Sequence, residues 1–337
     1  MLLGIGVAGF GVAAVSLAPR IPPAYLEPTS AKLDHVLAAD PPCDVLFFGS
    51  SHTLRGVKPA VFDRRSERLG HPARSFNFGV AGSRWLESDA TLRRTLAALE
   101  SPPSCVFVEV STFSTEIEEA NARKPRVVAW HDRDSMPVIL ASVRGDRTED
   151  HFAKLDRYGF HLMHFGMNEL RVGDGPRIFE DRSPPEKLPM RLRYIPREQG
   201  YADFSKEKSP RARRRHERFL ARIESYEAMR KELVDDQNRL VPMPPWFAEA
   251  ILRQAASIEA LGTRVVYYVP PSHRKIVDLR CLTEAGFSVV RFDDPERYPE
   301  LYDPGYRHDH AHLNDAGAKI FSRELASVYA GAFSTAP

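Results

Sequence analysis

Five short apolar runs limit how this chain of 337 residues can fold more than any other feature does. They are rich in β-branched and aromatic residues and are bounded by turn-forming residues. Segments with helical periodicity, such as 83–99, 245–261 and 314–329, separate or follow them. Strands that alternate with helices are typical of an α/β protein with a parallel sheet. Such a sheet is covered by helices on both faces, so its strands need no polar alternation. The runs span residues 44–48, 74–78, 105–110, 264–269 and 288–292.

A long interruption, residues 115–244, lies between the third and fourth runs and is rich in charged residues and proline. We expect it to be a mostly helical insertion that divides the sheet domain into a first part, 21–114, and a second part, 245–332. Apolar residues recur in it at helical spacing, which predicts one helix packed on the main body. The arginine run 211–215 is expected to mark a solvated helix end, with contact to anionic glycan or lipid headgroups as the alternative. The apolar residues are Phe219, Ile223, Tyr226, Met229 and Leu233.

The N-terminal segment 2–18 carries no charged side chain. Its length is borderline for crossing about 30 Å of hydrocarbon and long for the core of a signal peptide. This predicts an extracytoplasmic protein, periplasmic or secreted, in which residues 1–20 are a cleaved signal peptide or a retained membrane anchor. Small residues at Ser16 and Ala18 would suit cleavage, whereas Arg20 follows the run, so both alternatives stay open.

Composition excludes several other classes of protein. Hydrophobic residues make up 43% and charged residues 27%, which is the mix of a folded soluble domain. The net charge of +2 gives no electrostatic reason to expect a nucleic-acid partner. Three cysteines are too few for a disulfide scaffold.

Two segments far apart in the sequence carry residues suited to nucleophilic catalysis. The first apolar run leads directly into Gly49-Ser50-Ser51-His52-Thr53, and ligands gather at the carboxyl ends of parallel strands. Near the other end, Asp309 and His312 are three positions apart just before the last helical segment. This spacing lets a carboxylate bind one imidazole nitrogen while the other nitrogen faces a serine. Ser51, His312 and Asp309 are therefore the candidate catalytic residues. Asn314 or Asp315 could cap the following helix.

Together these segments resemble the SGNH (GDSL-like) hydrolase superfamily over residues 43–113 and 262–329. The first block of that family is Gly-Asp-Ser, so Gly49-Ser50-Ser51 matches it with Ser50 in place of the aspartate. The last block, Asp-x-x-His followed by leucine, matches Asp309-x-x-His312-Leu313 and is the more specific of the two. The resemblance implies a three-layer α/β/α fold with a five-stranded, parallel, flavodoxin-like sheet and Ser51 as the nucleophile.

The family also has a glycine block that donates a backbone N–H to the oxyanion, and residues 77–83 of this chain resemble it. The resemblance implies Gly82 as the donor, with Gly79 as the next candidate. The N–H of Ser51 would be the companion donor.

The third block of the family, Gly-x-Asn-Asp, is not matched by this chain, which has Ser111-Thr112-Phe113-Ser114 there. Phenylalanine cannot donate a hydrogen bond. Either the hydroxyl of Thr112 or Ser114 supplies a third oxyanion contact, or the oxyanion hole has two backbone donors. Loss of one such donor lowers the rate by about 100- to 1000-fold.

With these departures, the chain is similar to a divergent branch of the superfamily. This branch contains the SGNH-like proteins that help membrane O-acyltransferases to acetylate cell-envelope polysaccharides. By analogy the chain would be an esterase or O-acyltransferase. Ser51 would attack an ester, foremost an acetyl ester, and water or a sugar hydroxyl would accept the acyl group. An acylated carbohydrate would be the substrate and a membrane O-acyltransferase a partner, with no cofactor required.

Other interpretations of the same residues stay open. His308, His310 and His312 would share one face of an extended segment and could bind a metal, although metal ligands usually converge from several elements. Phe113 also favours a non-catalytic carbohydrate-binding or assembly protein that keeps the scaffold without the reaction.

The resemblance makes the runs that begin at Cys43 and Cys105 neighbours, so a disulfide could join them, with two buried thiols as the preferred alternative. The tryptophans that could stack on sugars, or more usually pack in the core, are Trp85, Trp130 and Trp246.

Overall fold

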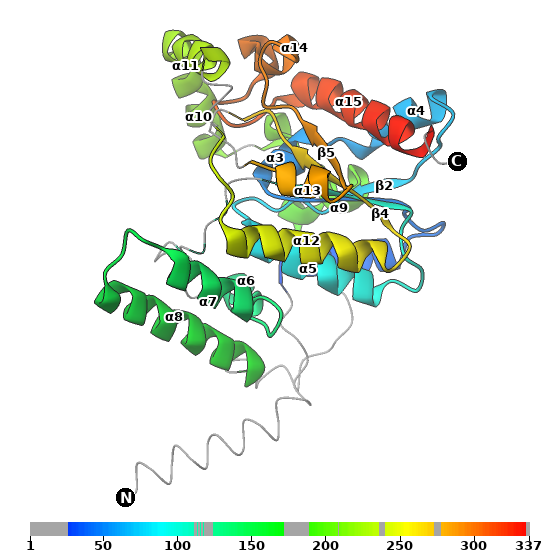
Figure 1. Ribbon diagram of the computed structural model, residues 1–337. Coiled ribbons are helices and arrows are strands. Elements are labelled where there is room, and N and C mark those ends of the chain that lie inside the picture. The colour runs from blue at the N-terminus through cyan, green and yellow to red at the C-terminus, as the bar shows by residue number, and fades with distance from the viewer. Residues whose placement is uncertain are drawn as a thin grey trace, which may run out of the picture. The chain divides into compact units, whose positions relative to one another are not determined.

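The predicted sheet is present, and all of its strands are parallel (Figure 1). The computed structural model describes residues 26–110, 113, 115, 117, 124–171, 189–207, 209–235, 240–272 and 278–334. The strand order is β2-β1-β3-β4-β5, which is the flavodoxin-like order. The fold class expected from the sequence, α/β with a five-stranded parallel sheet, is therefore confirmed. The strands are β1 (Val45–Phe48), β2 (Ser75–Asn77), β3 (Cys105–Glu109), β4 (Arg264–Val269) and β5 (Ser288–Arg291).

Helices cover both faces of the sheet, as a doubly buried parallel sheet requires. On one face lie α4 (Pro59–Arg68) and α15 (Asp315–Ser334), and on the other lie α5 (Trp85–Ala98) and α12 (Pro245–Glu259) (Figure 1). Consecutive side chains of β4 point to opposite faces of the sheet, and so each contacts a different helix layer. Tyr268 packs in the cluster that contains Phe321 of α15, whereas the Tyr267 hydroxyl donates to Gln254 Oε1 of α12 at 2.9 Å.

The core is richest in aromatic side chains at β1 and β3. The rings of Phe47 and Phe107 stack with their centroids 4.8 Å apart, and Phe62 of α4 meets Phe47 edge-on at 5.0 Å. Every residue of β1 is fully buried. Because β1 pairs with β2 on one side and with β3 on the other, the turn that follows β1 begins at an interior strand of the sheet.

The interruption between β3 and β4 is divided between two compact units. One unit includes Thr115–Lys187, and the other comprises Ala31–Ser114 and Leu188–Pro337. Residues 188–244 are thus in the same unit as the sheet. In the described part of Thr115–Lys187 the helices are α6 (Pro125–Ala129), α7 (Met136–Gly145) and α8 (His151–Glu169). Those of the second half of the interruption are η4 (Met190–Leu192), α9 (Tyr194–Arg197), η5 (Phe204–Lys206), α10 (Pro210–Leu220) and α11 (Ile223–Asp235).

The prediction of one helix through residues 219–233 is wrong, because α10 and α11 are separate helices. The helix ends where the Arg222 N–H pairs with the Phe219 carbonyl three residues back, which tightens the last turn. The expected packing is nevertheless present at two of the five apolar positions. Phe219 and Tyr226 are buried, 1% and 0% exposed.

Smaller helices complete the chain. They are α2 (Thr29–Leu37), α3 (Ser51–Gly56), α13 (Arg280–Glu284), α14 (Pro299–Tyr302) and η6 (Pro304–Tyr306). The predicted signal peptide or anchor, residues 1–20, lies outside the described residues. Within the ranges described above, none of the helices has the length and apolar character that a membrane crossing demands.

The unit that includes Thr115–Lys187 contains a buried histidine cluster, which makes its stability dependent on pH. His131 Nε2 and His161 Nδ1 are 3.0 Å apart, and burial is the main cause that lowers the pKa of His131 to about 3 and that of His161 to about 4. Neighbouring His164 lowers both further, Arg157 lowers that of His161, and Asp132 opposes the shift at His131.

We therefore predict that acid destabilises this unit. In the unfolded chain both imidazoles titrate near their ordinary pKa, about 6.5, so below that pH the unfolded state binds more protons than the folded state. The stability present above about pH 6.5 is lost as the pH falls towards about 4, by about 1.4 kcal/mol for each unit of pKa difference. Thermal unfolding followed between about pH 7 and pH 4 measures this loss.

A matched pair of variants isolates the contribution of the cluster. His161→Gln should flatten the pH dependence of the melting temperature, whereas His151→Gln, at an exposed position of the same helix, should not. An equal pH dependence in both variants would contradict the assignment.

Candidate active site

Ser51 lies at the carboxyl end of β1, where the chain turns directly into α3. It is the first residue of that helix, and Ser50 is the N-cap, whose hydroxyl accepts from the His52 N–H at 3.2 Å. Gly49 makes the turn possible, since a Cβ atom at this position would collide with the side chains of Thr53 and Glu109. The first N–H groups of a helix have no partner within the helix, so the Ser51 hydroxyl lies beside backbone donors.

The structure brings the three candidate catalytic residues together. His312 Nε2 is 2.8 Å from Ser51 Oγ. On the other side of the ring, His312 Nδ1 is 2.9 Å from Asp309 Oδ1 and 3.1 Å from Oδ2. The serine, the imidazole and the carboxylate thus form a continuous hydrogen-bonded chain, in the order that nucleophilic catalysis by serine requires.

The loop that carries Asp309 and His312 is fixed by its own hydrogen bonds. Asp309 Oδ1 accepts from the N–H groups of Ala311 at 2.8 Å and His312 at 2.9 Å. Buried Arg307 donates to the carbonyls of Leu301 at 3.0 Å and His310 at 2.6 Å.

The helix that follows the loop is capped at its N-terminus. Asn314 Oδ1 accepts from the Gly317 N–H at 3.0 Å, which is the capping role that the sequence suggested for Asn314 or Asp315. The Asp315 carboxylate instead pairs with Lys58 at 2.5 Å and with Lys319 at 2.5 Å.

The electrostatic state of the pair suits a general base. Burial lowers the pKa of His312 below its ordinary value, and this outweighs the opposing effect of the Asp309 carboxylate. Burial alone would raise the pKa of Asp309, but its hydrogen bonds with His312 and with backbone N–H groups hold it well below its usual range. At neutral pH the imidazole is therefore neutral and the carboxylate is ionised, which is the state that accepts a proton from serine.

A buried carboxylate that the sequence analysis missed holds the turn after β1. Glu109, the last residue of β3, is 3% exposed. Its Oε2 accepts from the N–H groups of Ser50 at 2.8 Å and Thr53 at 3.1 Å, and its Oε1 accepts from the Ser50 hydroxyl at 2.5 Å. The Thr53 hydroxyl also donates to it and is 2.5 Å from the Tyr268 hydroxyl.

The charge of Glu109 is stabilised by these contacts. Burial alone would raise its pKa, yet the hydrogen bond and charge of His52, together with the hydrogen bonds of Ser50 and Thr53, lower it to about 2. His52 Nδ1 is 3.5 Å from Glu109 Oε1, and the His52 ring stacks on His312 with centroids 5.4 Å apart. The carboxylate thus contacts both residues that flank Ser51.

The candidate oxyanion donors differ in their surroundings. The Gly79 N–H donates to Asn77 Oδ1 at 2.8 Å, so this donor is already used and the role expected for Gly79 needs correction. Gly82 has a positive φ of 72°, a conformation that favours glycine. Ser51 provides the remaining backbone candidate at the start of α3. Thr112 lies outside the described residues.

Asn77 and Lys32 fix the glycine segment against the rest of the site. Asn77 Nδ2 donates to the carbonyls of Thr53 at 2.8 Å and Val57 at 2.7 Å, which ties β2 to α3. Buried Lys32 Nζ donates to the carbonyls of Asn77 and Gly79 at 2.8 Å each and to that of Gly200 at 3.1 Å. No local pattern indicates this role of Lys32, because a lysine on an amphipathic helix is ordinarily exposed.

Phe113, the residue that led us to consider a protein without activity, lies among other aromatic rings. Its centroid is 4.4 Å from that of Trp246, 4.5 Å from Phe247 and 5.8 Å from Trp85. These rings pack against one another, so Trp85 and Trp246 have the packing role that we considered the more usual one. Trp130 stacks on His131 with centroids 3.9 Å apart.

The histidines of the 308–312 segment do not converge on one point. His308 stacks on Phe204 at 3.9 Å, whereas His310 meets the edge of Phe219 at 5.4 Å and His312 faces Ser51. In the part of the chain that the structure describes, no group of three or more histidine, cysteine, aspartate or glutamate side chains could hold a metal ion.

The three cysteines are all free thiols, and they are Cys43, Cys105 and Cys281. Cys43 and Cys105 are therefore not joined, and of the two buried thiols expected as the alternative, Cys105 is buried and Cys43 is half-buried. Burial raises the pKa of the Cys43 thiol to about 11, so it is protonated at neutral pH.

Comparisons with known proteins assign no family to this chain. No protein-family model matches it, and no curated protein matches it either.

We predict that Glu109→Gln impairs the reactivity of Ser51 without unfolding the protein. An amide nitrogen cannot accept the hydrogen bonds that one carboxylate oxygen now accepts, so the turn after β1 would shift, and a displacement of about 1 Å can lower a rate by about 100-fold. The rate of labelling of Ser51 by a fluorophosphonate measures the effect, and circular dichroism checks the fold. Glu100→Gln, an exposed change shortly before β3, is the matched control. Equal labelling rates for both variants would exclude a positioning role for Glu109.

Proposed function

We propose that the protein is a serine esterase or O-acyltransferase that forms an acyl-serine intermediate. The observation that carries the proposal is the chain of hydrogen bonds from Asp309 through His312 to Ser51, with 2.9 Å and 2.8 Å between the joined atoms. Ser51 and Asp309 are 258 positions apart in the sequence, so the fold brings these residues together. A neutral imidazole that is hydrogen-bonded to a serine hydroxyl can take its proton and so activate the serine as a nucleophile.

In the first half of the reaction, Ser51 Oγ attacks the carbonyl carbon of an ester while His312 Nε2 takes the hydroxyl proton. Asp309 stabilises the imidazolium and keeps the proton on Nδ1 directed towards itself. The negative charge moves to the carbonyl oxygen, where the N–H groups of Ser51 and Gly82 are the proposed donors. The tetrahedral intermediate then collapses, the C–O bond to the alcohol breaks, and His312 gives its proton to the departing oxygen.

In the second half, an acceptor hydroxyl attacks the acyl-serine and gives its proton to His312. Collapse of the second tetrahedral intermediate returns the proton to Ser51 Oγ. Water as acceptor makes the protein a hydrolase, and a sugar hydroxyl makes it a transferase. Release of acetate from an acetylated glycan, measured with and without an acceptor sugar, distinguishes the two.

The resemblance of residues 49–51, 77–83 and 309–313 to SGNH hydrolases supports an ester as substrate. By analogy with the divergent branch, we propose an acylated cell-envelope carbohydrate outside the cytoplasm, with a membrane O-acyltransferase as donor partner. A carbohydrate-binding protein without activity is the second candidate, and the aromatic packing of Phe113 in place of a polar block favours it.

We predict that Ser51→Ala abolishes labelling by a serine-directed fluorophosphonate, because the variant lacks the hydroxyl that His312 activates. Ser327→Ala, an exposed serine of α15, should be labelled like the unchanged protein. Persistent labelling of Ser51→Ala would place the nucleophile elsewhere. If the folded, unchanged protein is neither labelled nor active on any ester, the non-catalytic candidate is favoured.

We further predict that Asp309→Asn lowers ester turnover by about 10³- to 10⁴-fold and leaves the fold intact. The asparagine oxygen can still accept the N–H groups of Ala311 and His312, but it no longer stabilises the imidazolium or the required tautomer. Steady-state kinetics measure the loss. Asp303→Asn, whose carboxylate likewise accepts a backbone N–H two residues ahead, is the control and should retain activity. Near-normal turnover by Asp309→Asn would reduce its role to holding the loop.

A further inference from the structure

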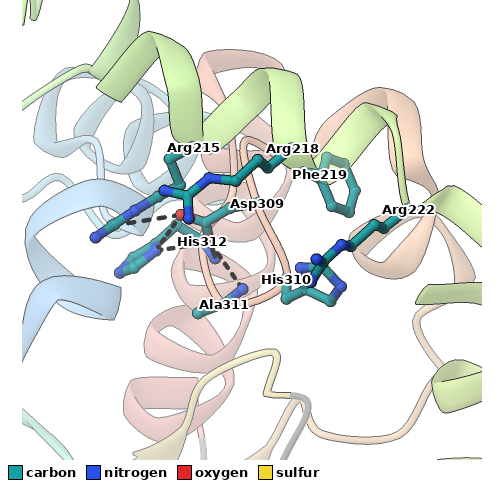
Figure 2. A pocket seen from close by; sticks show the side chains of 8 residues that line it. All are labelled: Arg215, Arg218, Phe219, Arg222, Asp309, His310, Ala311 and His312. Carbon is teal, nitrogen blue, oxygen red and sulfur yellow. Dashed lines mark hydrogen bonds and ion pairs between the residues drawn. The ribbon is translucent and has the colours of Figure 1, made fainter. Parts of the chain in front are cut away.

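A pocket beside the triad is formed where α10 faces the loop that carries His312. Its volume is about 410 Å³. Figure 2 shows Arg215, Arg218 and Arg222 on the side of α10 and the segment from Asp309 to His312 on the other side. Phe219 closes the pocket between the arginines and is 1% exposed, so the arginines border a hollow.

The spacing of the three arginines places them on one side of their segment. Arg215 and Arg218 are three positions apart on α10 and are therefore neighbours on its surface, and Arg222 lies in the turn directly after this helix. The other arginines of the 211–215 run do not line the pocket. Arg211, Arg213 and Arg214 are exposed in the first turns of α10, as expected for a solvated helix end, and Arg215 is the member of the run that lines the pocket.

Within the described ranges, the arginines of the pocket have one carboxylate as an ion-pair partner. Arg215 Nη1 is 3.5 Å from Asp309 Oδ2, at the limit of a hydrogen bond. Among the described residues, no acidic side chain forms an ion pair with Arg218 or Arg222. Asp309, which is the acidic residue of the lining, already accepts three hydrogen bonds from Ala311 and from the backbone and ring of His312. Three guanidinium groups thus face one carboxylate that has other partners.

Guanidinium groups are suited to bind a particular class of ligand. Their planar fork pairs with the two oxygens of a carboxylate or phosphate, and such charge-assisted hydrogen bonds are about twice as strong as neutral ones. A volume of 410 Å³ lies in the range of small-molecule sites and can hold a group the size of a sugar.

The pocket adjoins the catalytic residues, because two of the three, His312 and Asp309, line it. A ligand bound by the arginines would therefore reach the imidazole that contacts Ser51. We infer that this pocket is an anionic subsite, which binds a carboxylate or phosphate on the sugar that carries the reacting ester. The inference rests on the proposed function and adds the class of substrate to it: an acylated, negatively charged carbohydrate.

The inference is tested by the preference for charged over neutral substrates. The probes are three acetylated sugars, methyl glucoside, methyl glucuronide and methyl glucoside 6-phosphate, which differ in the group at the sixth carbon. We expect kcat/KM to be higher for one or both charged probes. The double variant Arg218→Gln/Arg222→Gln should lower the ratio of charged to neutral kcat/KM by about 10- to 100-fold, as the loss of hydrogen bonds to a charged group does.

Arg213→Gln is the matched control, because Arg213 is an exposed arginine of α10 outside the pocket. It should leave the ratio unchanged. The glucuronide and phosphate probes show which anion is bound. A ratio near one in the unchanged protein, or a ratio that the double variant and the control change equally, would overturn the inference.

A binding experiment separates this inference from the proposed chemistry. In Ser51→Ala, calorimetric titration with unacetylated methyl glucuronide and methyl glucoside 6-phosphate should show binding that the added Arg218→Gln/Arg222→Gln changes abolish. Binding by this variant together with absence of turnover in the unchanged protein would refute the enzyme and retain the anionic subsite. Binding only to vesicles of phosphatidylglycerol, with none to either sugar, would replace the subsite by a lipid contact and overturn the inference.

Discussion

The buried carboxylate of Glu109 is the interaction on which the arrangement of the site depends. A carboxylate inside a sheet domain is tolerated only when hydrogen-bond donors surround it, and here the donors come from the turn that contains Ser50, Ser51 and Thr53. β1 and β3 are adjacent in the sheet, so the end of β3 fixes the start of α3. This interaction also favours serine over aspartate at position 50. An aspartate in place of Ser50 would put a second carboxylate against Glu109, whereas a serine hydroxyl donates to it.

The second half of the interruption contributes to the site. Phe219 of α10 and Tyr226 of α11 meet the His310 ring with centroids 5.4 Å and 5.8 Å apart, and the Tyr226 hydroxyl donates to the Tyr302 carbonyl at 2.8 Å. These contacts cover the loop whose other residues include Asp309 and His312. Residues 209–235 therefore stabilise the base of the proposed reaction and also line the adjoining pocket.

The sequence predicted those features that depend on local patterns. The strands were found because doubly buried parallel strands are apolar throughout, and the ends differ by no more than one residue from the predicted runs. The spacing of Asp309 and His312 indicated a pair because a carboxylate three residues before histidine can reach its ring.

Features that depend on tertiary contacts could not be predicted in the same way. Glu109 lies in an apolar run and only the proximity of Ser50 and Thr53 gives it a role. Likewise, nothing in the local sequence indicates that Arg215, Arg218 and Arg222 line a pocket beside His312. Gly79 matched a family block, but the side chain of Asn77, two residues before it, takes up its N–H.

Arg215 affects the catalytic histidine through its charge. The charge of Arg215 contributes to lowering the pKa of His312, after burial as the main cause, while Asp309 raises it. This favours the neutral imidazole that must accept the proton of Ser51, but the same charge opposes the imidazolium that forms during attack. An anion bound between the arginines would offset their charge close to His312 at that stage. A charged sugar would thus be oriented by the pocket and would also stabilise the protonated His312. Its binding would therefore assist the proton transfer from Ser51. A neutral ester of the same shape could not have this effect.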